Sequence, residues 1–171
     1  FGRCTDRRVG ARESRRWGDG DSYLGRRPYG DKSRIGIWGW CYGRLNSMMS
    51  MWGGRSVFRA GVAIAPPPNW KFYDSVYTER YMRTPKENPD GYATNPIERA
   101  SKLHGALLIC HGTADDNVHP QNAYEYSEAL VQADKDFREL YYTNRNHSIY
   151  GGNTRNHLLR QVAQFFQTEL R

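Results

Sequence analysis

The sequence RIGIWGWCYG, residues 34–43, joins a short apolar run to closely spaced glycines. Its first half predicts a buried strand over 34–38, and apolar side chains at helical spacing predict a helix over 42–52. Gly39 and Gly43 flank Cys41, each two residues away. Small residues at this spacing let a backbone turn sharply and lift the central side chain above a sheet. We therefore expect a strand, a tight turn with Cys41 at its corner, and a helix.

A side chain at such a corner can act as a nucleophile. Serine is the usual residue there, but a thiol supports the same covalent chemistry once a base ionises it, because the thiolate is the attacking species. The pattern alone is also compatible with a buried thiol that has no chemical role.

The rest of the chain continues the alternation of strands and helices. Apolar runs predict strands over 58–65, 106–110 and 137–142, and amphipathic patterns predict helices over 120–133 and 154–170. This alternation favours an α/β fold with a doubly wound, mostly parallel sheet. A length of 171 residues fits one domain with its own core.

The net charge of +7 is concentrated near the N-terminus, where residues 1–34 hold ten Lys or Arg and five Asp or Glu. We expect 1–33 to be a basic, poorly ordered leader or degenerate N-terminal part, and 34–171 to be the catalytic domain. The basic segment lacks the pattern of a nucleic-acid module, so we expect no nucleic-acid partner. No apolar run resembles a membrane span or signal peptide, and three widely spaced cysteines suggest neither a disulfide framework nor a zinc site.

Three polar groups follow predicted strands: Cys41, Asp115 and His147. The order nucleophile, acid, base is the order found in α/β-hydrolases. In this interpretation Cys41 attacks a carbonyl, His147 moves the proton, and Asp115 holds the imidazole tautomer, while the Tyr42 backbone N–H stabilises the oxyanion. Each residue also has a structural interpretation, because a lone histidine is often only a hydrogen-bonding group and an aspartate can cap a helix.

The other four histidines receive structural interpretations. We expect His104 and His157 at helical or solvent-facing positions and His111 as a hydrogen-bonding residue in a loop. His119 lies in the same loop as Asp115, so it could line the site, but a structural role is favoured.

Residues 69–94 are rich in aromatic side chains. Trp70, Tyr73 and Tyr77 are spaced to share one face of a helix. They could pack into the core or form the wall of an apolar pocket, and the spacing favours neither.

Four segments resemble the catalytic domain of the prolyl oligopeptidase family, most of all its bacterial members of the dipeptidyl peptidase IV type. They are residues 34–43, 70–82, 111–119 and 146–154. The resemblance runs from about Ser22 to the C-terminus.

The resemblance implies an α/β-hydrolase fold and hydrolysis of peptides after a penultimate proline, without metal or cofactor. Cys41 matches the nucleophile, Asp115 the acid and His147 the base. The remaining matches concern the substrate. The apolar residues that surround the proline ring in the family match Trp70, Tyr73, Tyr77 and Val118, and the residue that hydrogen-bonds a substrate carbonyl matches Asn117. The resemblance further implies a periplasmic or secreted location. A sheet edge left unpaired by missing upstream strands would favour aggregation or a homodimer.

The chain also departs from the family pattern. Cys41 stands in place of serine, and Arg44 stands in place of a second glycine. We expect the strands before the elbow, with an oxyanion tyrosine, and the family's β-propeller to be missing. Weakened peptidase activity is therefore expected. The alternatives are a catalytically dead remnant or peptide-binding fragment of the family and, from the Cys41 corner alone, a small cysteine-dependent esterase or lactone hydrolase.

Overall fold

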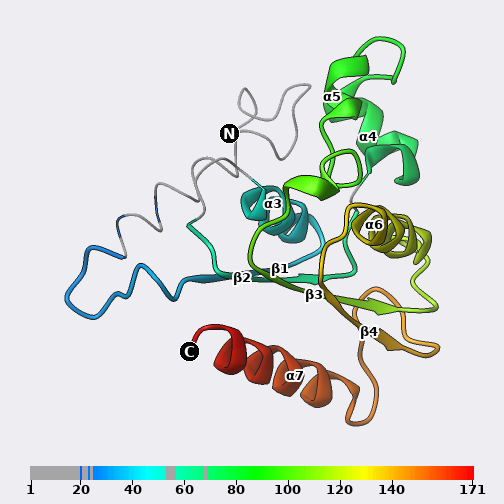
Figure 1. The fold of residues 1–171 in the computed structure, drawn as a ribbon. Coiled ribbons are helices and arrows are strands. Elements are labelled where there is room, and N and C mark those ends of the chain that lie inside the picture. The colour runs from blue at the N-terminus through cyan, green and yellow to red at the C-terminus, as the bar shows by residue number, and fades with distance from the viewer. Residues whose placement is uncertain (1–19, 21–22, 24, 53–56, 68) are drawn as a thin grey trace.

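The computed structural model describes residues 20, 23, 25–52, 57–67 and 69–171 of the chain. Most of the predicted leader over 1–33 lies outside the described residues. Residues 34–171, apart from two short gaps, form one sheet with helices packed on it (Figure 1).

A four-stranded sheet forms the centre of the described structure, in the order β1-β2-β3-β4. Its strands are β1 (Gly36–Trp40), β2 (Ala60–Ile64), β3 (Ala106–Gly112) and β4 (Arg138–Tyr142). Each neighbouring pair is parallel, as the sequence predicted. Trp40 pairs with Ile64, which pairs with Cys110, which pairs with Leu140, so the carboxyl ends of all four strands meet at one edge of the sheet.

Helices cover both faces of this sheet (Figure 1). On one face lie α3 (Tyr42–Met51) and α6 (Gln121–Gln132), and on the other lies α7 (Thr154–Glu169). Every residue of β2 is buried, because a central strand covered on both sides is apolar throughout. This is the α/β-hydrolase arrangement that the sequence predicted. None of the helices in the described residues is long and apolar enough to span a membrane.

Two apolar layers hold the helices against the sheet. Met48 and Met51 of α3 and Leu130 of α6 are fully buried in the first layer. Leu158 of α7 is fully buried in the second, with Phe165 beside it. Each such side chain contributes about 1.5–3 kcal/mol when it leaves water, so the layers fix where the strand ends lie.

The expected strands and helices are confirmed, with ends that differ by at most two residues. The largest shift is in β1, which was predicted over 34–38 and runs from Gly36 to Trp40. Asp31 explains the later start. Its carboxylate accepts hydrogen bonds from Ser33 N at 2.9 Å and Arg34 Nε at 2.7 Å and so holds these residues in a turn.

One prediction about the segment between β2 and β3 is wrong. Trp70, Tyr73 and Tyr77 do not share one helix, because a 3-10 helix, Trp70–Phe72, ends before Tyr73 and α4, Ser75–Met82, begins after Asp74. Asp74 caps α4 by accepting a hydrogen bond from Tyr77 N at 2.9 Å. The segment then continues through a second short helix and a last helical turn, which are α5 (Pro89–Ala93) and the 3-10 helix Ala100–Lys102.

Candidate active site

Cys41 lies at the corner between β1 and α3, directly after Trp40. Its φ of 56° and ψ of −127° are in a region that glycine adopts freely and other residues rarely adopt. A strained backbone at this point costs on the order of 1–3 kcal/mol and is typical of functional sites. The side chain is half-buried.

The residues after Cys41 begin α3, and Tyr42 is its first residue. Backbone N–H groups in the first turn of a helix have no partner within the helix, so the Tyr42 N–H is of the right kind to bind an oxyanion. The side chains of Tyr42 and Arg44 fall outside the described part of the chain, and with them the expected effect of Arg44 on packing. At Gly43, an added Cβ would meet no atom of the described residues within 4 Å.

Asp115 follows β3, and its side chain is fully buried. Its Oδ1 accepts hydrogen bonds from Asn117 N at 3.0 Å and Val118 N at 2.9 Å. Its Oδ2 lies 2.8 Å from His147 Nδ1. Burial acts to raise the pKa of the Asp115 carboxyl, but hydrogen bonds from His111, His147 and Val118 N hold that pKa well below its usual value. The carboxylate is therefore charged at neutral pH.

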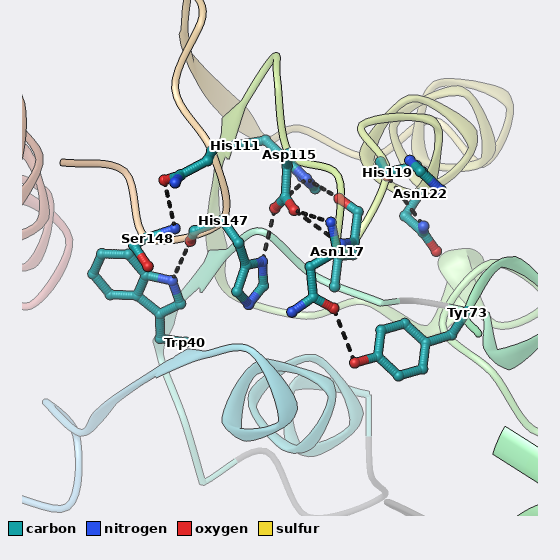
Figure 2. A network of polar contacts seen from close by, with 11 residues as sticks. Trp40, Tyr73, His111, Asp115, Asn117, His119, Asn122, His147 and Ser148 are labelled. Carbon is teal, nitrogen blue, oxygen red and sulfur yellow. Dashed lines mark hydrogen bonds and ion pairs between the residues drawn. The ribbon is translucent and has the colours of Figure 1, made fainter. Parts of the chain in front are cut away.

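His147 lies in the loop after β4, 32 residues from Asp115, and 18% of its side chain is exposed. Because a carboxylate only accepts hydrogen bonds, His147 Nδ1 carries the proton of this contact. In the neutral ring, Nε2 is then the basic nitrogen. Figure 2 shows the imidazole pointing to Asp115, between Trp40 on one side and Asn117 on the other.

His111 does not lie in a loop, so that prediction is wrong: it is the second-last residue of β3 and is fully buried. Its Nε2 lies 2.8 Å from the Val118 carbonyl oxygen and 3.3 Å from Asp115 Oδ2. Both partners are acceptors, so Nε2 carries the proton. His111 thus contacts the Asp115 carboxylate from the buried end of β3. A histidine that continues an apolar strand, just before the acid loop, was the signal that could have identified it.

The other histidines take structural positions. His157 lies on α7, as predicted, and its Nδ1 is 2.9 Å from the Tyr142 hydroxyl. His104 is half-buried in the link before β3, and burial lowers the pKa of its imidazole. His119 is exposed, and its carbonyl accepts a hydrogen bond from Asn122 Nδ2 at 3.1 Å.

Trp70, Tyr73 and Tyr77 come together although they lie on separate elements. The Trp70 ring stacks on Tyr77 at 5.8 Å between centroids, and Tyr73 meets both rings edge-on. Trp70 is buried, whereas 37% of Tyr77 is exposed. The cluster therefore has a core side and an open aromatic side, which combines the two interpretations that the sequence left open.

The aromatic cluster reaches the acid loop through Tyr73. The Tyr73 hydroxyl donates a hydrogen bond to Asn117 Oδ1 at 3.0 Å (Figure 2). Burial is the main cause that raises the pKa of the Tyr73 hydroxyl, and the negative charge of a Cys41 thiolate raises it further. The hydroxyl therefore stays protonated and remains a donor. Asn117 is exposed, but Val118 is fully buried and offers no surface to a ligand in this conformation.

Within the described residues, no group of three or more His, Cys, Asp or Glu side chains could hold a metal ion. The residues that we expect to act on a substrate lie together at the carboxyl edge of the sheet. They are the corner cysteine, the bonded Asp–His pair and the aromatic cluster. These features and the parallel sheet between helices define the α/β-hydrolase class.

The chain belongs to the prolyl oligopeptidase family, because the model of that family matches residues 3–171. It is 42% identical over 141 residues to dipeptidyl peptidase 4 of Bos taurus and 39% identical over 141 residues to prolyl endopeptidase FAP of Mus musculus. Each alignment covers 80% of this chain and 18% of the relative. The family resemblance inferred from the sequence is confirmed.

The fold is similar to the crystal structure of Porphyromonas gingivalis dipeptidyl peptidase 4, with a TM-score of 0.95 and 50% identity. The match covers 98% of this chain and 24% of that chain. The chain thus spans about a fifth to a quarter of the length of these relatives.

Proposed function

We propose that this chain carries the catalytic centre of a peptidase that cleaves peptides after a proline, with a cysteine in place of serine. The single observation that carries the proposal is the pair of His147 and Asp115, 2.8 Å apart and partly shielded from solvent, at the same sheet edge as the strained Cys41 corner. A carboxylate that accepts from Nδ1 leaves Nε2 free of that proton, as general-base catalysis requires.

In the proposed reaction, His147 Nε2 takes the Cys41 thiol proton as sulfur bonds to the scissile carbonyl carbon. The carbonyl oxygen gains the electron pair and accepts a hydrogen bond from Tyr42 N–H. As the C–N bond breaks, the imidazolium returns its proton to the leaving amine, and a thioester remains. His147 next deprotonates water, the hydroxide displaces sulfur from the acyl carbon, and the proton restores the thiol.

Substrate selection is assigned to the aromatic cluster. Trp70, Tyr73 and Tyr77 present a rigid apolar wall that suits the flat, apolar ring of proline. Because Tyr73 occupies the Asn117 side-chain oxygen, the amide nitrogen of Asn117 can donate to a substrate carbonyl. The substrate proposed is a peptide whose second residue is proline.

The test is release of chromophore from Gly-Pro and Gly-Leu anilides by the chain, by Cys41→Ser and by Cys41→Ala. Turnover of Gly-Pro anilide that Cys41→Ala and a thiol alkylator both abolish would support a working cysteine centre, and preference over Gly-Leu anilide would support the proline pocket. The assay must detect slow rates, because a thiol stands at the position where the family has serine.

The Cys41 thiol itself favours a second candidate, a peptide-binding domain without catalysis, because the family position holds a different nucleophile. If only Cys41→Ser turns over, the scaffold is competent and the thiol is the defect. If none of the three folded proteins turns over, yet a Gly-Pro dipeptide still changes tryptophan fluorescence, the binding function replaces the catalytic one.

A further inference from the structure

Two side chains from distant parts of the chain hold the backbone of the His147 loop. Trp40 Nε1 donates a hydrogen bond to the His147 carbonyl at 2.9 Å (Figure 2), and Arg155 Nη2 donates one to the Ser148 carbonyl at 2.7 Å. The two also contact each other, because the Arg155 guanidinium carbon lies 5.5 Å from the Trp40 ring centroid. This is within the range of a cation–π interaction. We call Trp40 and Arg155 the clamp.

The loop that the clamp holds has a strained backbone. Ile149 has a φ of 44°, which is a severe outlier for a β-branched residue, and Asn144 has a φ of 54°. Burial of the Ile149 side chain, which is complete, offsets part of this cost. A strained loop keeps its conformation only where surrounding contacts hold it.

The acid loop supplies such contacts before His147. Ala114 N donates to the Arg145 carbonyl at 3.1 Å, and Asn144 N donates to Thr113 Oγ1 at 2.9 Å. From His147 onward, the clamp binds the carbonyls of His147 and Ser148. Hydrogen bonds therefore fix the backbone on both sides of the His147 imidazole.

Two adjacent carbonyls fix more than two atoms. Each carbonyl oxygen lies in its own planar peptide unit, so holding those of His147 and Ser148 orients two successive planes. The first plane begins at the His147 Cα, from which the imidazole extends. A small rotation of this plane would move Nδ1 away from Asp115.

We propose that Trp40 and Arg155 are positioning residues that set the orientation of the His147 imidazole. The proposal rests on the proposed function, because it concerns the base of that reaction. Trp40 is the residue immediately before Cys41 and lies 107 positions from His147. Its hydrogen bond therefore ties the base loop to the strand that ends at the nucleophile corner, so one contact sets the distance between the two.

The test compares Trp40→Phe and Arg155→Gln with two matched controls. Trp38→Phe makes the same substitution on β1 at a side chain that is 52% exposed, and Arg160→Gln makes the same substitution five residues further along α7. We expect Trp40→Phe to lower kcat for Gly-Pro anilide about tenfold, since one net hydrogen bond is worth roughly that factor, with KM within about twofold. Arg155→Gln should lower kcat about threefold. The controls should match the parent chain.

A second measurement needs no turnover. The Nδ1 proton of His147, observed by NMR in protein with labelled histidine, should lose intensity through faster exchange in Trp40→Phe and in Arg155→Gln, but not in the controls. Arg155→Lys, which keeps the charge and a donor, should restore part of the signal.

The two measurements separate the two proposals. A parent chain with no turnover would refute the proposed function, while the NMR signal would still decide on the clamp. The clamp is refuted if His147 Nδ1–H is unchanged in both clamp variants, or if kcat of Trp40→Phe equals that of Trp38→Phe in an active protein. If Trp40→Phe fails to fold, the two measurements on Arg155→Gln, a substitution at an exposed position, still test the clamp.

Discussion

The acid–base loops, residues 113–118 and 143–152, and the elbow, residues 40–43, hold their functional groups by opposite means. Asp115 is fixed by attraction: two backbone N–H groups and His147 bond to its carboxylate, and His111 lies close by. Cys41 is fixed at a backbone conformation that costs energy. The contacts of Asp115 stabilise the protein, whereas the elbow, like Asn144 and Ile149 of the base loop, uses up part of that stability.

This difference separates folding from chemistry. Hydrogen bonds around a buried carboxylate would persist in a protein that had lost catalysis, because they also satisfy buried polar groups. A strained non-glycine residue has no such structural benefit. The bonded Asp115–His147 pair by itself therefore indicates a stable fold, and it indicates function because it lies at the same sheet edge as the strained elbow.

The largest expected effect comes from Asp115→Ala. It removes the partner of His147 Nδ1 and of two backbone donors, of which Val118 N is buried and Asn117 N partly buried, so we expect about 3 kcal/mol less free energy of unfolding. Any parent activity should fall by about 10⁴ because the imidazole loses its tautomer. Urea unfolding and anilide hydrolysis measure the two effects. A loss of activity with unchanged stability would contradict the structural role given to this carboxylate.

A smaller loss is expected for Gly112→Ala, at the end of β3. Its Cβ would overlap the Arg145 carbonyl oxygen, so the base loop must move away from the acid loop. We expect about 2 kcal/mol less free energy of unfolding, measured in urea. The control is Gly43→Ala on the elbow side, where a Cβ meets none of the described residues, and its stability should be unchanged or slightly higher. Equal effects at both glycines would remove the contrast between the regions.

Acid should weaken the acid–base loops through Asp115. Its folded pKa is lowered below the unfolded value of about 3.9, so the unfolded state binds more protons and stability falls as pH drops from about 5. Asp115→Asn removes this titration. We expect the free energy of unfolding of the parent chain to fall more steeply in acid than that of the variant. Parallel curves would show that the carboxylate gains nothing from its partners.

The smallest effect, with the opposite sign, is expected for Cys41→Gly. Glycine accepts a φ of 56° without strain, so the free energy of unfolding should rise by about 1 kcal/mol, while any activity is abolished. Cys41→Ala also lacks the thiol but keeps the Cβ, so the comparison of glycine with alanine isolates the backbone strain. If glycine does not stabilise the protein relative to alanine, the corner is not strained.

Much of the arrangement was readable from local patterns. Strand and helix positions followed from apolar spacing, and the corner at Cys41 followed from the glycines around it, because these features depend on neighbouring residues. The spacing of Trp70, Tyr73 and Tyr77 predicted a single helix and was wrong, because Asp74 caps a new helix after Tyr73. A single capping side chain ended the predicted helix, although the aromatic rings still met.

The sequence by itself determined the strand and helix elements, the family, and the order of Cys41, Asp115 and His147 along the chain. Only the tertiary structure decided that His111 supports the acid, that Val118 is covered, and that Trp40 and Arg155 hold the base loop. The contact between Trp40 and His147 joins residues 107 positions apart. The contacts of His111 with Asp115 and of Arg155 with Ser148 join residues only four and seven positions apart, but they too depend on how a strand or helix meets a loop. They exist because a parallel sheet brings the carboxyl ends of its strands to one edge, and no local pattern records which side chains meet there.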